Sequence, residues 1–421
     1  MSVLQNIDKL ISNSWFFPSG IAVVLSTLYI GYAPTSIGLG ALGFFILWYR
    51  LRLDKNINFH FALVLPFLIY GLMLISYFWS IDQPLSLKGL GRLSNFVIIP
   101  AMFILMPRFD VKATNRVLML FTYSNCAFAV VFLIIAVLRF IKSNDTAVFA
   151  YHELVSGLEL NAIYVSIFFL SSYFYLLNKK GKSILDKVAV PFLAVVIILL
   201  SSKMALIILT LGTLIYFFGF KGWGFLRNLK ILILVLASLV AVVFISRQMT
   251  NRFLEEKRSN IEEILKKKQF GRIYLWTGTT IRVFHLRLLK EQMEDDKIFW
   301  NGYGVFASRI DLKERHKKYD TYKGFHDYNY HNQYAQIMAE LGIAGLLFLI
   351  GMLILMARSG IARSDYFTLV FALMMIFIFT SESFLWVQRG LVFFMIFYGL
   401  LARLDIAPKK TTFKAKNLLK S

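Results

Sequence analysis

One group of polar residues stands out because it contains side chains that can move a proton. It consists of three segments that are close in the sequence: Asn301–Phe306, Tyr330–Tyr334 and Glu340–Gly345. Within it, His331 and Asn332 mark the point where a long polar stretch meets an apolar run. A neutral imidazole near pH 7 is suited to general-base catalysis, so His331 is the first catalytic candidate. Its alternative role is that of an interfacial residue that only makes hydrogen bonds.

Basic side chains that border apolar runs are candidates for binding an anionic group. Lys203, Arg92 and Arg139 are selected by position, and Arg272 is added by a resemblance described below. Lys203 opens an apolar run, and a charge at the centre of a membrane helix costs about 2.5–3.5 kcal/mol. That cost falls near a helix end, so a function is suggested but not required. The alternative role of Arg272 is that of an anchor at the membrane interface. The alternative role of Arg92 is a contact with lipid headgroups.

Other charged and metal-binding residue types give weaker signals. Arg389 follows Glu382 closely, and we expect these two side chains to pair. Asp295 and Asp296 lie in a charged helical stretch typical of a surface, and Cys126 is the only cysteine, so no metal cage or disulfide is expected. Three histidines lack metal-ligand spacing: His152, His316 and His326. We therefore expect neither a metal nor a cofactor.

The elements that must position these residues are membrane helices. Hydrophobic residues make up 58% of the 421 positions, 41 residues are Phe, and charged residues are only 17%. One soluble core cannot hide that much apolar surface, whereas a bilayer accepts it. The net charge of +22 lies mostly in short turns between apolar runs, which indicates membrane orientation rather than nucleic-acid binding.

Twelve apolar stretches are long enough to cross a hydrocarbon core of about 30 Å. They fall near 15–31, 33–49, 60–79, 91–107, 115–138, 160–178, 187–201, 203–220, 229–246, 333–357, 364–381 and 384–402. The seventh and eighth can also be drawn as one long broken helix. The fold class predicted is an all-α integral membrane protein with about twelve spans and a large, partly helical periplasmic loop before the tenth span.

Alternate loops carry the Lys and Arg residues, which places both termini in the cytoplasm. The chain then divides into spans one to nine (1–246), a periplasmic loop (247–331), spans ten to twelve (332–403) and a basic cytoplasmic tail (404–421). Periplasmic segments 80–90 and 139–159 contain basic residues against this pattern, as expected if they meet an anionic ligand.

The large loop is predicted to contain short amphipathic helices lying on the membrane rim. In the stretch 272–289, five residues would share one helical face: Ile273, Trp276, Thr280, Phe284 and Leu288. A polar cluster where such a loop meets a helix bundle is a place at which a membrane enzyme can meet a lipid-linked substrate.

The motifs resemble those of the O-antigen ligase and O-antigen polymerase superfamily. The resemblance rests on Gly-x-Gly at 302–304, the His331–Asn332 pair, and Glu-x-Gly-x-x-Gly at 340–345. It covers roughly 272–345; elsewhere it concerns topology alone. The resemblance implies transfer of a glycan from undecaprenyl pyrophosphate to a hydroxyl on the periplasmic face, without a metal. It also implies that His331 is the base and Arg272 holds the pyrophosphate.

One position departs from the family pattern, which has Ser-Arg where this chain has Ser202-Lys203. The positive charge is kept, but the bidentate fork that suits phosphate oxygens is lost. Lys203 is thus a point-charge candidate for the same pyrophosphate, together with Arg92 and Arg139.

The resemblance makes an inner-membrane O-antigen ligase the expected function, with undecaprenyl-pyrophosphate-linked polysaccharide as donor and lipid A-core as acceptor. An O-antigen polymerase and an O-linked protein glycosyltransferase remain open on the same scaffold. A flippase is an alternative of another class. It predicts internal repeats and broken, charged helices at mid-membrane, and the sequence has no clear repeat.

Overall fold

The computed structural model of the chain describes residues 3–57, 59–221, 254, 260–271 and 273–402. Every regular element in these ranges is a helix. The predicted ninth span at 229–246, the candidate Arg272 and the basic tail 404–421 lie outside the described residues.

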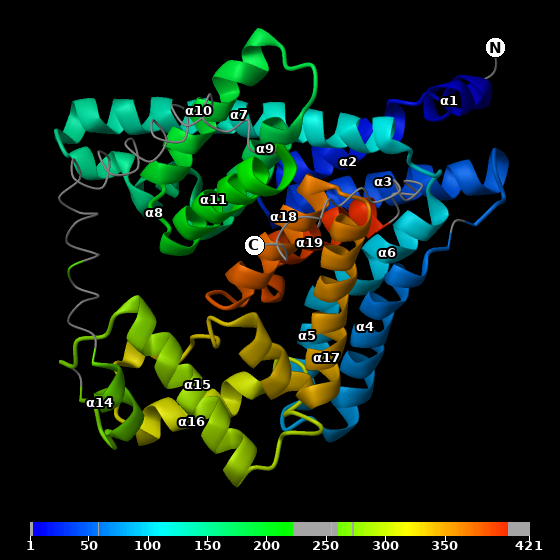
Figure 1. Cartoon of the computed structure of the whole chain (residues 1–421). Helices are drawn as coiled ribbons and strands as arrows, with labels where there is room; N and C mark the ends of the chain where they lie inside the picture. The colour runs from blue at the N-terminus through cyan, green and yellow to red at the C-terminus, as the bar shows by residue number, and fades with distance from the viewer. Residues whose placement is uncertain (1–2, 58, 222–253, 255–259, 272, 403–421) are drawn as a thin grey trace, which may run out of the picture.

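The helices divide into two sets, called apolar and polar after the character of most of their members. The apolar set comprises α1 (Val3–Ile11), α2 (Phe16–Thr27), α3 (Tyr32–Arg52), α4 (Val64–Ser76), α5 (Gln83–Leu93), α6 (Asn95–Leu105), α7 (Val111–Ser143), α8 (Tyr151–Val155), α9 (Ala162–Asn178), α10 (Ile184–Leu199), α11 (Lys203–Ile215), α17 (Gln333–Ala362), α18 (Tyr366–Phe379) and α19 (Gln388–Ala402). The polar set comprises α14 (Ile261–Lys266), α15 (Gly278–Asp295) and α16 (Ser308–Lys318). The polar set forms a separate cluster, and α17 connects this cluster to the apolar set (Figure 1).

Within the described residues, six helical segments are long and apolar enough to cross a bilayer, and two bent helix pairs raise this to eight. The pairs are α1 with α2 and the segment Tyr151–Leu158 with α9, bent by 77° and 92°. Helices α18 and α19 are apolar but shorter. The chain is thus a multi-pass membrane protein, as predicted, and the number twelve stays a prediction. The doubtful stretch near residue 200 is two helices, because α10 ends at Leu199 and α11 begins at Lys203.

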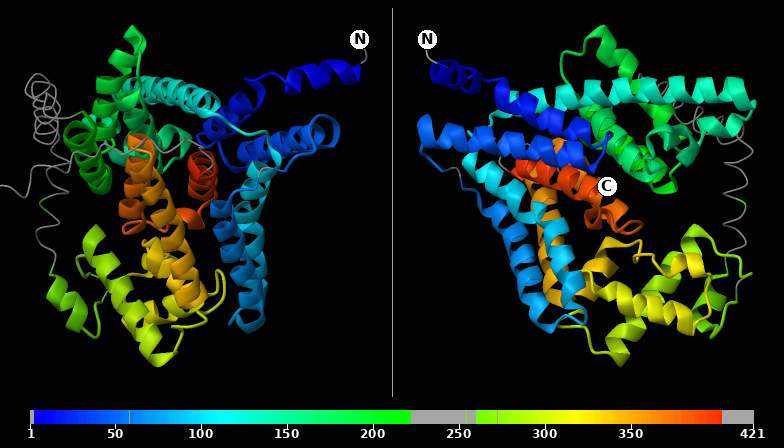
Figure 2. Two further views of the ribbon diagram at one scale, coloured as in Figure 1. Left: turned by 45° about the vertical axis from the view of Figure 1, so that its right-hand side comes forward. Right: turned by 180° about the vertical axis from the view of Figure 1, so that it is seen from behind.

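Segments that the charge alternation assigns to one side of the membrane lie together in space. At one end, Arg52 pairs with Asp8 at 3.0 Å, and Arg116 donates to the Ser14 carbonyl at 2.8 Å. At the other end, the Trp79 indole donates to the Asn301 carbonyl at 3.0 Å. Two views turned about the vertical axis show the polar helices α14–α16 on that second end (Figure 2). This grouping agrees with the predicted sidedness.

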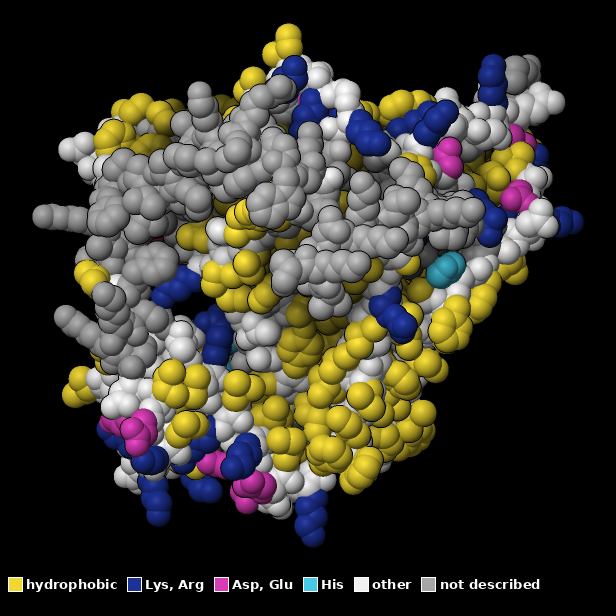
Figure 3. All heavy atoms as spheres, in the orientation of Figure 1, with side chains coloured by type: hydrophobic (Ala, Val, Ile, Leu, Met, Phe, Trp, Pro, Cys, Tyr) yellow, Lys and Arg dark blue, Asp and Glu magenta, His cyan; other side chains and the backbone are white. Residues whose placement is uncertain are grey.

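The apolar exterior is concentrated on the long helices. Yellow side chains form a broad continuous area over α4 and α17, whereas charged side chains crowd the α14–α16 cluster (Figure 3). A surface of this kind suits lipid contact on the helices and water contact on the cluster.

The loop helices bury apolar side chains within their own cluster, and their predicted place on the membrane rim stays a prediction. Thr277 caps α15, so Ile273 precedes the helix and is 97% exposed. Thr280, Phe284 and Leu288 are buried as predicted. They face a small apolar core of the cluster itself, since α14, α15 and α16 pack on one another and on the start of α17. The amphipathic pattern thus predicted burial correctly but not what covers the buried face.

Candidate functional site

The site is organised by a break in α17. Gly342 has φ 66° and ψ −162°, which interrupts the helix in its N-terminal third. The backbone of the segment 299–304 fills the break: Tyr303 N–H donates to the Ala339 carbonyl at 2.8 Å, and Gly304 N–H donates to the Glu340 carbonyl at 3.0 Å. Ile343 N–H in turn donates to the Phe299 carbonyl at 2.8 Å. We call these three hydrogen bonds the backbone latch.

The glycines of the two sequence motifs are explained by this latch. Gly302 and Gly342 both have φ 66°, a conformation that favours glycine. A Cβ on Gly302 would overlap the backbone of Glu340, and one on Gly342 would overlap the carbonyl of Trp300. The motifs that pointed to a family therefore have a structural role, which is to join the loop cluster to α17 through close backbone contact.

His331 lies directly before α17, so the first segment of that helix separates it from the latch. It has φ 46°, and its N–H donates to the Asn329 side chain at 2.8 Å. Asn332 caps α17 by accepting from Ala335 N–H at 3.0 Å, and its amide group donates to the Thr380 carbonyl at 3.2 Å. The backbone of His331 and its neighbour Asn332 are thus held in place, which keeps the imidazole at the helix mouth.

The imidazole of His331 faces a buried carboxylate. Its Nδ1 lies 3.5 Å from Oε1 of Glu382, and the side chains are 26% and 7% exposed, respectively. A carboxylate beside Nδ1 favours the tautomer that carries its proton there, leaving Nε2 as the proton acceptor. The predicted pair between Glu382 and Arg389 is therefore wrong: the described ion pairs join Glu382 to His331 instead.

Two further histidines stand behind His331. The ring of His285 is nearly parallel to that of His331, with centroids 6.2 Å apart, and its Nε2 is 3.0 Å from Nε2 of His316. Burial lowers the pKa of His285 well below its ordinary value and lowers the pKa of His316 to about 3. Both rings are therefore neutral at pH 7. Among the described residues, no group of three His, Cys, Asp or Glu is arranged to hold a metal.

Arg282 of α15 contacts the short turn between α18 and α19, which also carries Glu382. Nε of Arg282 donates to the Ser381 carbonyl at 2.8 Å, next to Glu382, and its Nη1 donates to the Gly278 carbonyl at 2.6 Å. Arg282 and His285 are one turn apart on α15, so the helix directs both toward the mouth of α17. The sequence analysis missed Arg282; its spacing from His285 was the available signal.

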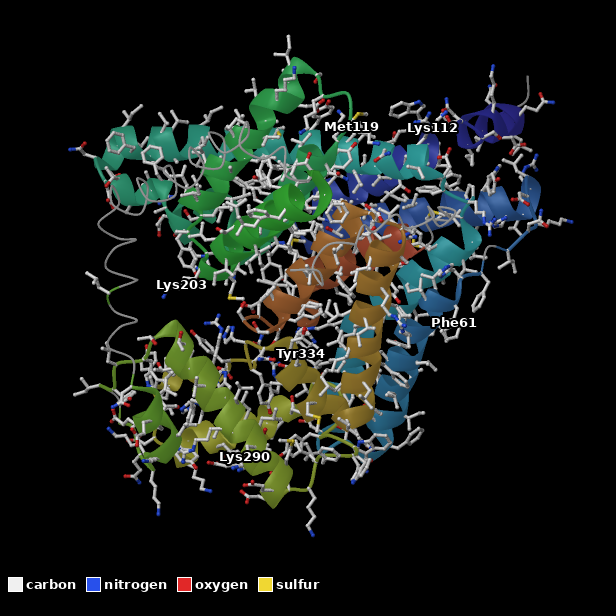
Figure 4. All side chains as sticks on the ribbon, in the orientation of Figure 1. Phe61, Lys112, Met119, Lys203, Lys290 and Tyr334 are labelled. Atoms are coloured by element: carbon white, nitrogen blue, oxygen red, sulfur yellow. The ribbon has the colours of Figure 1, made fainter. Side chains whose placement is uncertain are left out.

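The predicted cations are distributed unevenly around this centre. Lys203 begins α11 on the side that faces the start of α15, whereas Tyr334 marks the mouth of α17 (Figure 4). Arg139 is bound at 2.5 Å to the Glu153 carboxylate and also to Ser156, so a phosphate would have to displace an existing partner. The described residues do not include Arg272.

Arg92 belongs to a second cationic group. Its guanidinium lies 5.7 Å from the ring of Phe306, which stacks on Trp386 at 4.3 Å. Arg309 lies 4.9 Å from Trp386, and burial and the nearby charge of Arg92 both lower its pKa. The Trp386 indole also donates to the Glu340 carboxylate at 2.9 Å. Arg92 further lines a groove of about 590 Å³ beside α3 and α6.

Together these features define a membrane protein in which a histidine and an arginine of the loop region meet a carboxylate of the α18–α19 turn. Residues 188–350 match the family model described as O-antigen ligase, so this part of the chain is similar to that family. The matched range contains Lys203, Arg282, His331 and the latch, but neither Arg92 nor Glu382. No curated protein matches the chain.

Proposed function

We propose that the protein is an inner-membrane O-antigen ligase. It would transfer a glycan from undecaprenyl pyrophosphate to a sugar hydroxyl of lipid A-core. The observation that carries this proposal is the contact of His331 with Glu382 beside Arg282, in a chain that is similar to this family over residues 188–350. A base, a carboxylate that orients it and a cation for the leaving group are the components that glycan transfer from a diphosphate needs.

In the proposed reaction, Nε2 of His331 removes the proton from the acceptor hydroxyl. The hydroxyl oxygen attacks the anomeric carbon of the glycan, while the bond from that carbon to the phosphate oxygen breaks. Its electron pair leaves with undecaprenyl pyrophosphate. The carboxylate of Glu382 stabilises the imidazolium that forms, as an acidic partner does for other catalytic histidines.

Cations stabilise the charge that grows on the leaving pyrophosphate. Arg282 bonds the carbonyl of Ser381, the residue before Glu382, and Lys203 faces the start of α15. We propose Arg282 and Lys203 as the pyrophosphate contacts. Arg272 keeps this role as a prediction from the resemblance, and Arg92, on the groove beside α3, would meet the lipid donor as it approaches.

The proposed orientation has both termini in the cytoplasm and the α14–α16 cluster in the periplasm. It is supported by the segregation of basic residues and by the clustering of the segments predicted to share a side. A reporter joined after Ser421 should be active only as a cytoplasmic fusion, and one inserted at Lys318 only as a periplasmic one. The reverse result at either position would overturn the proposed orientation.

The catalytic role of His331 is tested with purified full-length protein and a lipid-linked donor. His331→Ala should lower turnover by about 10²-fold or more, because a general base supplies ~10²–10⁴ of the rate. Donor binding should be preserved, since the base acts in the transition state. The control is His60→Asn: His60 is at the other end of the molecule, and asparagine can keep its cap on Ala62 N–H. Normal turnover by His331→Ala would refute the assignment.

Ligase and polymerase activities differ in the product that accumulates in cells. Loss of the gene should leave lipid A-core without polymer while polymer builds up on the lipid carrier. Core that bears a single repeat would instead identify a polymerase. Lipopolysaccharide gels distinguish the two outcomes, and unchanged lipopolysaccharide would contradict both.

A further inference from the structure

A second cavity, of about 220 Å³, adjoins the turn that carries Glu382. Three elements form its wall: the start of α3 at Tyr32, the start of α9 from Asn161 to Phe168, and the start of α19 at Val387 and Arg389. This volume is large enough for a small polar group.

Two hydrogen-bond donors on this wall have no partner. Nε of Arg389 and the hydroxyl of Tyr164 are both buried, and neither makes a hydrogen bond within the described residues. Tyr164 is only 5% exposed. A buried donor left unpaired costs about 1–3 kcal/mol, and more when it is charged. Two such donors on one cavity indicate a ligand that supplies acceptor oxygens.

The charges around the cavity favour an anion. Arg389 is held 5.1 Å from the ring of Tyr32, and its expected partner Glu382 contacts His331 instead. The described ion pairs therefore leave the arginine charge uncompensated. Helix α9 also begins at this wall, with Asn161 as its cap, and the positive end of its dipole favours a negative ligand. Two negative charges oppose an anion here, the exposed Glu159 on the rim and the buried Glu382, whose charge also acts on Tyr164.

The cavity is connected to the proposed reaction centre through two residues of the α18–α19 turn. Glu382 contacts His331, and its charge also acts on the Tyr164 hydroxyl. Phe384, two residues later, stacks on the Tyr164 ring with centroids 4.7 Å apart. A group bound by Tyr164 and Arg389 would therefore sit near a saccharide whose hydroxyl or anomeric carbon reaches His331.

We propose that this cavity is an anion subsite that binds a phosphate, diphosphate or carboxylate carried by a substrate saccharide, with Arg389 Nε and the Tyr164 hydroxyl as donors. Anion binding follows from the cavity itself. Only the attribution of the anion to a substrate rests on the proposed function. The anion has two possible sources, which are the diphosphate of the donor and an acidic substituent on the acceptor.

Anion binding is tested first, with the full-length protein in detergent and three probes: inorganic pyrophosphate, inorganic phosphate and glucuronate. A ligand that binds the folded state raises the thermal midpoint as its concentration rises. We expect at least one probe to stabilise the unaltered protein, and Arg389→Gln and Tyr164→Phe each to reduce that shift by half or more. The control Arg358→Gln removes an exposed arginine of α17 and should keep the full shift. No shift with any probe, or a full shift in both cavity variants, would overturn the proposal.

The source of the anion is then read from steady-state transfer. Arg389→Gln should raise KM about tenfold for one substrate: for the donor if the diphosphate occupies the cavity, or for the acceptor if its substituent does. Unchanged KM values for both substrates would refute the link to substrate. An enzyme that transfers no glycan but shows Arg389-dependent stabilisation would contradict the proposed function while leaving the anion subsite standing.

Discussion

Replacing Gly342 by alanine tests whether the backbone latch fixes the site. The φ and ψ of Gly342 lie in a region essentially reserved for glycine, where another residue costs about 1–3 kcal/mol. Its new Cβ would also overlap the Trp300 carbonyl. That carbonyl belongs to the backbone and cannot rotate away as a side chain can, and overpacking of this kind adds about 1–3 kcal/mol. Keeping the latch would therefore cost roughly 2–6 kcal/mol.

The variant can instead release the segment 299–304 from the break. Release gives up the three latch bonds, each worth about 0.5–1.5 kcal/mol, or roughly 1.5–4.5 kcal/mol in all. The two costs are similar, so the chain follows the cheaper route. We expect a loss of about 2–4 kcal/mol, a large part of a typical total stability of 5–15 kcal/mol.

Amide hydrogen exchange measures this loss at the latch itself. A loss of 2–4 kcal/mol should speed exchange at Tyr303, Gly304 and Ile343 by roughly 30- to 1000-fold. Gly351→Ala is the matched control on the same helix, because its Cβ would meet nothing nearer than Leu65 Cδ1 at 3.5 Å. Equal exchange at Tyr303 in the two variants would refute the reasoning.

Three further predictions concern the reaction and the loop cluster. Arg282→Ala should raise KM for the donor and lower kcat, and Arg282→Lys should recover little, because lysine lacks the planar fork that bonds Ser381; a normal KM for the donor would exclude the pyrophosphate contact. Glycan transfer should persist in excess EDTA, and loss that Mg²⁺ restores would refute a metal-free mechanism. The pKa of His316 in the folded protein is about 3, below its ordinary 6.5, so its contribution to stability is full above pH 6.5 and is lost as pH falls toward 3. The thermal midpoint of the loop cluster should accordingly drop below pH 6.5, and His316→Gln should flatten that dependence; an equal slope in the variant would contradict it.

Much of the fold was predictable because membrane helices have a simple sequence signature. Runs of apolar residues gave the positions of α3, α4, α7, α11 and α17, and the break at Lys203 separates α10 from α11. Hydropathy could not predict the tertiary arrangement of the helices. Helices α2 and α9 meet their preceding helices at sharp bends, and α15 buries its apolar face within the loop cluster. A single-sequence pattern records that a face is apolar, not which surface covers it.

The candidate site was predicted in part, for a similar reason. His331 could be singled out because it adjoins a motif and a span. Glu382 could not be assigned to it, because the two residues are far apart in the sequence and only the α18–α19 turn brings them together. The same turn explains the wrong prediction for Arg389. Its proximity in sequence suggested Glu382 as its partner, whereas in the structure Glu382 pairs with His331.

The α18–α19 turn also has a consequence for the order in which the molecule is assembled. A ribosome adds ~5–20 residues per second, so roughly 3–10 s separate the synthesis of His331 from that of Glu382. During that interval the nascent chain already holds the histidine, the Arg282 helix and the latch glycines, but lacks the carboxylate that His331 contacts. The centre is complete only when the last helical hairpin has entered the membrane. A chain cut short before α18 would therefore carry the motifs at 302–304, 331–332 and 340–345 and still lack the carboxylate that His331 contacts.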